Sequence, residues 1–501
     1  MKYFLIILVF IGGMTSLALE MCASRLLGAY FGTSLLIWAV LIGLILLYLT
    51  AGYFLGGRLA DRYPSARVLC NLTALAGLAT CIIPLISQSI LNWSITGIAQ
   101  LSVSVFASSL LGSALLFAVP VTLLGLVSPF AVRLLTKDVD HSGRISGSLY
   151  AISTLGSILG AFLPVLWLIP AVGVRRSLLI FGALLFAASL WGMRPRWRPS
   201  FAIPLILLLL PLGPLKEIPY LRYEQESLYN YIQVTQQPDG TRELILNEGQ
   251  AIHSIYYPDP QRVLTGWYWD YFLAAPYFNQ GFTPQKLKRV AIIGLAAGTI
   301  ARQFTQVYGP VAIDGVEIDP AIVEVGRKYF DMNEPNLHVY VQDGRAFLAT
   351  THAKYDVVVI DAFQQPYIPF QLTTREFFNE VRDHLSPGGV VALNTGHTAT
   401  DYRLVQAFVN TMHSVFPSVY TFNVPGTFNT EVMATMQPTS IETLRANLSR
   451  FSANEVMGQV ASEVLPVAQR GQPDGGLVFT DDRAPIEQIT DQLLLNYIQH
   501  P

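Results

Sequence analysis

Charged residues are scarce in this chain, and the scarcity is concentrated in one half. Lysine, arginine, aspartate and glutamate make up 13% of the 501 residues, against about 25% in an average soluble domain. No charged residue occurs between Leu26 and Gly57, whereas ordinary charge density returns from Tyr220 onward. We therefore expect an apolar N-terminal half that spans a lipid bilayer several times, joined to a soluble C-terminal half.

Cysteine is also rare, and the net charge is close to zero. The three cysteines, Cys22, Cys70 and Cys81, all lie in apolar segments, so we expect neither a disulfide framework nor a metal site. We assign them a packing role. A formal net charge of −2 gives no sign of a nucleic-acid partner.

Six apolar runs are long enough to cross a hydrocarbon core, which takes about 20 helical residues. A seventh run, 201–215, is short and contains three prolines, so it is either a short span or an interfacial segment. The first run is not followed by a small-residue cleavage site and a soluble chain, which favours a membrane helix over a removed signal peptide. The six runs lie at 3–28, 35–57, 67–90, 101–135, 145–169 and 175–192.

The basic loops predict an orientation. Arginine and lysine gather at 56–67, 133–144 and 193–198, whereas the loop at 87–97 carries no charge, so the N-terminus and the three basic loops are expected in the cytoplasm. Six spans then leave the C-terminal half in the cytoplasm, and seven leave it outside. Because the nucleotide site described next needs a cytoplasmic metabolite, we expect either that 201–215 does not cross fully or that the count of the other spans is off by one.

Strands and helices alternate in the C-terminal half. An Asp-Gly turn at 239–240 between two alternating segments predicts a β-hairpin. From Val290 onward, buried apolar strands alternate with helices, which predicts a parallel, doubly wound, Rossmann-like sheet. The expected domains are a transmembrane domain at 1–216 with six or seven helices, a small β-strand domain at 217–285, a Rossmann-like nucleotide-binding catalytic domain at 286–437, and a C-terminal helical extension at 438–501.

Small or acidic residues follow four of these strands. Ligands of such sheets bind beyond the carboxyl ends of the strands. Glu317 follows the glycines of the first strand end by about 20 positions, where an acidic side chain binds ribose hydroxyls. We therefore predict a nucleotide site at this edge. The residues at the four ends are Gly294 and Gly298, then Glu317, then Asp343 and Gly344, then Asp361.

Several motifs carry a resemblance to a known family. GLAAGT (294–299), VEIDP (316–320), QDGRAFL (342–348) and YDVVVIDAF (355–363) resemble motifs of spermidine synthases, the polyamine aminopropyltransferases. Over nearly its whole length the chain is similar to bacterial membrane-fused spermidine synthase-like proteins. The resemblance implies a class I S-adenosylmethionine-dependent transferase fold, a bacterial inner-membrane location with a cytoplasmic catalytic domain, and no metal or prosthetic group. It leaves a homo-oligomer open.

The resemblance also implies roles for individual residues. The donor is an adenosyl sulfonium, either decarboxylated S-adenosylmethionine or S-adenosylmethionine itself, and the acceptor is an amine or a membrane-delivered molecule. Asp361 is implied as the base and Tyr268 as the tyrosine beside the reacting amine. The implied donor-binding residues are Gly294, Gly298, Glu317 at the ribose, Asp343 at the adenine amino group, Gly344 and Ala362. The implied acceptor-binding residues are Tyr229, Asn230, Trp269, Asp270 and Gln364.

The chain departs from the family pattern at some of these positions. Ala297 and Gln364 stand where the family has aspartates, and Trp269 and Asn230 stand where it has glutamines. A diamine is a dication, and burying it needs opposed carboxylates, so a free diamine acceptor is put in doubt. Asp481 or Asp482 either compensates for the loss or is a surface charge, and we favour the surface charge.

Three functions therefore stay open. The first is a membrane-bound aminopropyltransferase that uses decarboxylated S-adenosylmethionine and an amine. The second is a methyltransferase, or another S-adenosylmethionine-consuming enzyme, acting on a lipid or membrane-delivered acceptor; Ala297 favours it, because the family's aspartate there holds the aminopropyl amine. The third is a transporter or sensor whose nucleotide domain only binds. It is favoured by Glu20, an ionisable residue of the first span, and by GGRLADR (56–62), which resembles a loop of major-facilitator transporters.

Overall fold

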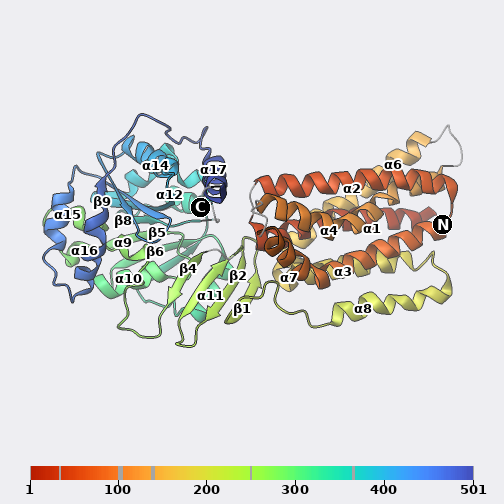
Figure 1. Cartoon of the computed structure of the whole chain (residues 1–501), viewed down its shortest axis with the longest axis horizontal. Helices are drawn as coiled ribbons and strands as arrows, with labels where there is room; N and C mark the ends of the chain where they lie inside the picture. The colour runs from red at the N-terminus through yellow and green to blue at the C-terminus, as the bar shows by residue number, and fades with distance from the viewer. Residues whose placement is uncertain are drawn as a thin grey trace. The chain divides into compact units, whose positions relative to one another are not determined.

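The computed structural model describes residues 2–32, 35–99, 105–136, 142–248, 251–363 and 367–499. The chain divides into two compact units. The first unit comprises Met1–Ile232 with Asn247–Gln250, and the second comprises Gln233–Leu246 with Ala251–Pro501. Figure 1 shows both units and labels many of their helices and strands.

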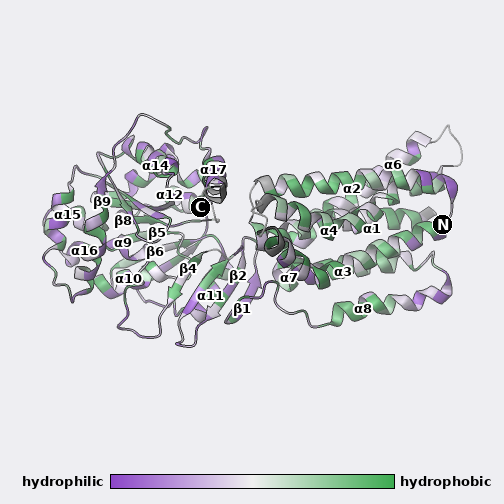
Figure 2. Ribbon diagram, in the orientation of Figure 1, coloured by the Kyte–Doolittle hydropathy of each residue, from purple (hydrophilic) through white to green (hydrophobic). Residues whose placement is uncertain are grey.

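Long apolar helices make up most of the first unit. Figure 2 shows them mainly in the colours of hydrophobic residues, and large apolar side chains such as Phe54 (68%) and Trp167 (62%) are exposed on them. The helical elements are α1 (Lys2–Phe31), α2 (Leu35–Arg62), α3 (Ala66–Ala99), α4 (Val105–Gly125), α5 (Val127–Leu135), α6 (Ser142–Leu163), η2 (Pro164–Leu168), α7 (Ile169–Ser189), η3 (Pro195–Phe201) and α8 (Ala202–Leu209).

Five stretches of the described residues are long and apolar enough to cross a membrane. The last of them, Ser142–Ser189, has 48 residues, which at 1.5 Å per residue is about 72 Å, more than twice the roughly 30 Å hydrocarbon core. Gly173 interrupts its helical backbone with a φ of 82°. Divided there, this stretch corresponds to the two runs predicted at 145–169 and 175–192. The other four are Tyr3–Phe31, Ile37–Arg62, Ala66–Ile95 and Ala107–Leu135.

The segment 202–215 runs along the helices of the first unit. Near the start of α1, the ring of Phe4 stacks on Trp191, with 6.4 Å between ring centroids. Near the end of α1, Tyr30 Oη donates a hydrogen bond of 2.7 Å to the carbonyl oxygen of Leu215. The chain between Trp191 and Leu215 therefore passes from one end of α1 to the other (Figure 1).

Four short strands form a sheet in the order β1-β2-β3-β4. The predicted Asp-Gly hairpin is confirmed between β2 and β3, where Gln237 N–H donates 2.8 Å to Thr241 O and Gly240 N–H donates 2.9 Å to Gln237 O. Gly240 has a φ of 87°, which a residue with a side chain rarely adopts. The strands are β1 (Leu221–Glu226), β2 (Tyr231–Gln236), β3 (Arg242–Leu246) and β4 (Ile252–Tyr256).

An eight-stranded sheet organises the second unit, in the order β12-β10-β11-β9-β8-β5-β6-β7. Five neighbouring strands of this sheet, β9, β8, β5, β6 and β7, pair in parallel. This arrangement confirms the predicted Rossmann-like fold. β11 pairs antiparallel with β9, and β10 pairs antiparallel with β11 and β12. The strands are β5 (Arg289–Ile293), β6 (Ala312–Glu317), β7 (Leu337–Val341), β8 (Tyr355–Ile360), β9 (Leu385–Gly396), β10 (Ser418–Asn423), β11 (Asn429–Thr435) and β12 (Ala468–Arg470).

The order of these strands creates a switch point between β5 and β8. The chain proceeds from β5 to β6 and β7, and then returns to place β8 and β9 on the other side of β5, which is where ligands bind in such sheets. Residues expected as a helical extension at 438–501 also form β12 of this sheet. The helices are α9 (Trp269–Phe272), α10 (Thr299–Tyr308), α11 (Pro320–Tyr329), α12 (Gly344–Thr350), α13 (Arg375–His384), α14 (Arg403–His413), α15 (Ile441–Leu448), α16 (Val456–Val467) and α17 (Ile486–Gln499).

Candidate active site

Asp361 lies at the switch point, directly after β8. Its backbone N–H donates 2.8 Å to the carbonyl oxygen of Ile293 at the end of β5, which fixes the carboxylate at the edge of the sheet. Oδ2 accepts hydrogen bonds from Tyr268 Oη (3.1 Å) and Trp269 Nε1 (3.2 Å). Oδ1 accepts one of 3.0 Å from Asn394 Nδ2. Desolvation outweighs these donors and raises the pKa of the carboxyl to about 7.

Tyr268 directly precedes α9, and Trp269 is the first residue of this helix. Burial, together with the negative charge of Asp361, raises the pKa of the Tyr268 hydroxyl well above its ordinary value, so the phenol remains a hydrogen-bond donor at neutral pH. Trp269 is 1% exposed and reaches Asp361 through its indole N–H. The structure therefore brings the predicted base, the predicted tyrosine and one predicted acceptor residue together.

Asp270 has a different environment from its neighbours Tyr268 and Trp269. Its carboxylate accepts hydrogen bonds from Thr265 N–H (3.0 Å), Gly266 N–H (2.7 Å) and Gln303 Nε2 (2.5 Å). It is fully buried. These contacts hold the turn before α9, and none of the hydrogen bonds of Asp270 within the described residues reaches Asp361.

The glycine loop after β5 is held by Glu317 at the end of β6. Glu317 Oε2 accepts 2.9 Å from Ala296 N–H, and Oε1 accepts 3.1 Å from Asp319 N–H. Burial raises the pKa of this carboxyl to about 7. Gly298 has a φ of 90° and directly precedes α10. Ala297 is 3% exposed, and its N–H donates 2.9 Å to Ser254 Oγ of β4.

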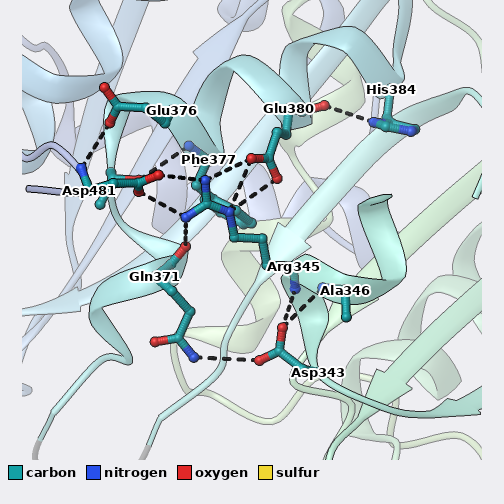
Figure 3. A network of polar contacts seen from close by, with 10 residues as sticks. Asp343, Arg345, Ala346, Gln371, Glu376, Phe377, Glu380, His384 and Asp481 are labelled. Atoms are coloured by element: carbon teal, nitrogen blue, oxygen red, sulfur yellow. Dashed lines mark hydrogen bonds and ion pairs between the residues drawn. The ribbon is translucent and has the colours of Figure 1, made fainter. Parts of the chain in front are cut away.

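Asp343 begins α12 after β7. Its Oδ1 accepts hydrogen bonds from the backbone N–H groups of Arg345 (2.9 Å) and Ala346 (3.0 Å), and its Oδ2 accepts a weaker one of 3.4 Å from Gln371 Nε2 (Figure 3). Gly344 packs tightly, because a Cβ there would come within 2.4 Å of Ile293 Cγ2. Packing alone thus explains a glycine at 344.

Asp481 belongs to an ion-pair network and not to the surroundings of Asp361. Arg345 Nη2 lies 2.7 Å from Glu380 Oε1 and 2.8 Å from Asp481 Oδ2, and Thr374 Oγ1 donates 2.6 Å to Asp481 Oδ1. Figure 3 shows Arg345 between the two carboxylates. The network ties the segment around Asp481 to α12 and α13, in agreement with the surface-charge alternative.

Two polar residues at this edge were missed by the sequence analysis. Asn394 lies on β9, donates to Asp361 and accepts 2.9 Å from Asn429 Nδ2. Glu431 lies on β11, directly opposite Asn394 in the strand register, and is 0% exposed. Burial and the charge of Asp361 raise the pKa of Glu431 well above its ordinary value. A single acidic residue within the apolar run of β11 was the available signal.

The structure does not test the roles of the remaining predicted residues. Asn230 is in the first unit, where its Oδ1 accepts 3.0 Å from Asn247 Nδ2. Tyr229 is in the same unit and is 41% exposed. Glu20 is partly exposed on α1, and Ala362 directly follows the base. Gln364 lies outside the described residues. Their roles stay predictions.

The sequence comparisons match polyamine aminopropyltransferases and the spermine/spermidine synthase domain. The spermine/spermidine synthase domain model matches residues 279–444. A probable polyamine aminopropyl transferase of Bifidobacterium longum is 37% identical over 53% of this chain and 61% of its own length. A polyamine aminopropyltransferase of Vibrio vulnificus is 32% identical over 43% of this chain and 71% of its own length. The crystal structure of a probable spermidine synthase from Corynebacterium glutamicum has a TM-score of 0.43 and 23% identity, covering 52% of this chain and 97% of that one.

Proposed function

Because this chain belongs to the polyamine aminopropyltransferase family, we propose that it transfers an aminopropyl group from decarboxylated S-adenosylmethionine to an amine. The observation that carries the proposal is the position of Asp361, at the switch point and in contact with Tyr268, Trp269 and Asn394. A base is needed there because an amine acceptor arrives protonated.

The proposed reaction is a single displacement. The amine nitrogen attacks the propyl carbon next to the sulfonium sulfur, so that a C–N bond forms while the C–S bond breaks. The sulfur leaves with the bonding electron pair as neutral methylthioadenosine. Asp361 accepts the proton that the ammonium must lose, and Tyr268 orients the carboxylate. Alignment of the two reactants supplies much of the rate.

The identity of the nucleoside product tests this function. Purified full-length protein is incubated with either sulfonium donor, together with simple amines or a membrane extract. We expect methylthioadenosine from decarboxylated S-adenosylmethionine and an amine. S-adenosylhomocysteine from intact S-adenosylmethionine would instead establish the methyltransferase alternative, which the alanine at position 297 favours. Tight donor binding without turnover would favour the sensor or transporter alternative.

A pH profile checks the role of Asp361. Its carboxyl has a pKa of about 7, and only the ionised form accepts a proton. We therefore expect kcat/KM to rise about tenfold per pH unit below pH 7 and to level off above it, since this parameter reports the groups of the free enzyme. Initial rates of methylthioadenosine formation between pH 5 and 9 measure the profile. A profile that is flat between pH 5 and 7 would contradict the assignment.

We also propose that the first unit is embedded in a membrane. Its five long apolar stretches and its exposed apolar side chains support this, because lipid is the solvent that such surfaces match. The basic loops at 56–67, 133–144 and 193–198 then face the cytoplasm.

The side on which residue 216 emerges depends on the segment 202–215. The eight residues of α8 rise about 12 Å, and the six non-helical residues Leu210–Leu215 can add up to about 20 Å, which together match a roughly 30 Å core. The course of this segment from one end of α1 to the other supports a seventh crossing, against our sequence-based expectation that 201–215 does not cross. We therefore propose that residues 216–232 lie on the side opposite the basic loops. This placement conflicts with our expectation that the nucleotide site needs a cytoplasmic metabolite, and a labelling experiment decides between the two.

Cysteine labelling of the full chain distinguishes the two placements. Pro64→Cys lies in a basic loop and Glu217→Cys follows the proposed crossing; both positions are exposed, while the native cysteines are buried. In intact spheroplasts we expect a membrane-impermeant maleimide to label Glu217→Cys, and to label Pro64→Cys only after permeabilisation. If both variants need permeabilisation, the segment 202–215 does not cross the membrane, and residues 216–232 lie in the cytoplasm with the basic loops.

A further inference from the structure

A cavity of about 330 Å³ lies in the second unit, between the loop that follows β4, the helix α10 and the loop that follows α11. None of the predicted site residues that the structure describes lines it. Pockets that hold small molecules begin at about this volume. The cavity is therefore a candidate for a second binding site, separate from the one at Asp361.

Two buried oxygen atoms in the walls of this cavity lack a hydrogen-bond donor. The amide nitrogen of Gln303 donates to Val263 O (3.2 Å) and to Asp270 Oδ1 (2.5 Å). Both partners are acceptors, so the remaining amide atom is the oxygen, and it has no partner among the described residues. Glu334 Oε1 lies 3.4 Å from Arg302 Nε, whereas its Oε2 also has no partner there. Because unpaired buried acceptors are destabilising, a ligand that donates hydrogen bonds would suit these walls.

The walls also carry more negative than positive groups. Arg302 is already engaged, because its Nη2 donates to the carbonyl oxygens of Phe330 and Asp331. Arg262 is exposed and lies over the ring of Tyr257, with its Cζ 3.5 Å from the ring centre. A cation is therefore better matched to the cavity than an anion. The lining includes two guanidinium groups, Arg262 and Arg302, and three carboxylates, Asp259, Asp331 and Glu334.

The same walls hold the turn that precedes α9. Thr265 and Gln303 both line the cavity, and both donate to the carboxylate of Asp270, Thr265 through its N–H (3.0 Å) and its Oγ1 (2.8 Å). Asp270 directly follows Trp269, whose indole N–H donates to Asp361. A ligand that binds Gln303 therefore restrains a turn that leads directly to the residues in contact with the proposed base.

We propose that this cavity binds a linear, positively charged polyamine, and that its occupancy stiffens the turn before α9. The ammonium groups supply the donors that Gln303 Oε1 and Glu334 Oε2 lack, and their charge matches the carboxylates of the walls. The methylene chain packs against Pro258 and Pro260, which also line the cavity. The site is separate from the position of a reacting amine at Asp361, so its existence does not depend on the proposed function.

Calorimetric titration of the full-length protein tests binding, with spermidine as the probe and no sulfonium donor present. We expect Glu334→Gln to weaken one class of spermidine site about tenfold or more, since a charged partner is lost. Gln306→Lys adds a positive charge at an exposed position of the wall, and should weaken the same class about as much. This second variant provides the measurement if the first does not fold.

Two control variants separate the cavity from the rest of the molecule. Glu380→Gln makes the same chemical change at a carboxylate that pairs with Arg345, outside the cavity. Asp361→Asn alters the candidate active site. Both should leave the affinity of this class of site within about twofold of the unaltered protein.

Hydrogen exchange tests the effect on the turn. The backbone N–H groups of Thr265 and Gly266 donate to Asp270. We expect spermidine to slow their exchange about threefold or more in the unaltered protein and in Asp361→Asn, but not in Gln306→Lys.

The outcomes are distinct. Unchanged spermidine affinity in both Glu334→Gln and Gln306→Lys, or an equal loss in Glu380→Gln, would overturn the site. Binding of inorganic phosphate in place of spermidine would also contradict it, because Arg262 would then determine the ligand. Spermidine binding without slower exchange would overturn the effect on the turn. A protein that forms no methylthioadenosine would refute the proposed function and leave this binding site standing.

Discussion

Asp361→Asn is expected to lower kcat by about a thousandfold, within the range of about 10² to 10⁴ that a positioned base contributes. The amide cannot accept the proton of the ammonium. In addition, Tyr268 Oη, Trp269 Nε1 and Asn394 Nδ2 all donate hydrogen bonds to the carboxylate of the unaltered protein. The NH2 group of the asparagine is itself a donor, so it would face at least one of these donors without forming a hydrogen bond. Donor affinity should stay nearly unchanged, because the predicted donor-binding carboxylates Glu317 and Asp343 lie at other strand ends.

Single-turnover formation of methylthioadenosine measures the chemical step, and calorimetric titration with the donor measures binding. Asp356→Asn is the matched control, since Asp356 lies at the start of the same strand, where it accepts hydrogen bonds from Lys288 N–H (2.7 Å) and Ser386 Oγ (2.7 Å). It should retain near-normal turnover. If Asp361→Asn keeps more than about a tenth of the rate, Asp361 is not the base.

Gly294→Ala is expected to impair both folding and activity. Gly294 has a φ of 88°, and a Cβ there would come within 2.4 Å of the carbonyl oxygen of Asp361 and 2.7 Å of Ala362 Cα. Contacts this short force the backbone that carries the base to move. A displacement of about 1 Å can cost about 100-fold in rate, and the left-handed backbone adds about 1–2 kcal/mol of destabilisation to about 1–3 kcal/mol for the overlap.

Gly309→Ala separates the backbone cost from the steric cost. Gly309 has a φ of 79° at the end of α10, but a Cβ there would meet no atom within 4 Å. Because its ψ of −164° places Gly309 in a backbone region that is essentially restricted to glycine, denaturant unfolding should show about 1–3 kcal/mol of loss for Gly309→Ala, with activity retained. Equal losses of stability and activity in the two variants would contradict the proposed displacement of Asp361.

Much of the second unit could be predicted from the sequence, because the signals are local. Continuous apolar strands between amphipathic helices require a parallel sheet covered on both faces, and the residues that follow such strands must share one edge. Gly294, Glu317 and Asp361 were found in this way. Tyr268 was found only through the family resemblance, since it precedes the sheet and nothing in its own segment indicates Asp361 as its partner.

The sequence by itself determined the apolar and soluble halves, the strand-and-helix alternation and the four strand ends, because periodicity and hydrophobicity act over a few residues. Only the tertiary structure decided that β11 returns beside β9 in a register that sets Glu431 opposite Asn394. It also decided that Asp270 accepts a hydrogen bond from the turn before α9, and that Asp481 pairs with Arg345. Strand register and side-chain partners depend on contacts between distant segments. A lone glutamate in an apolar strand and a lone aspartate in a loop look alike in sequence. Glu431, however, has no hydrogen-bond partner among the described residues, whereas Asp481 is paired with Arg345.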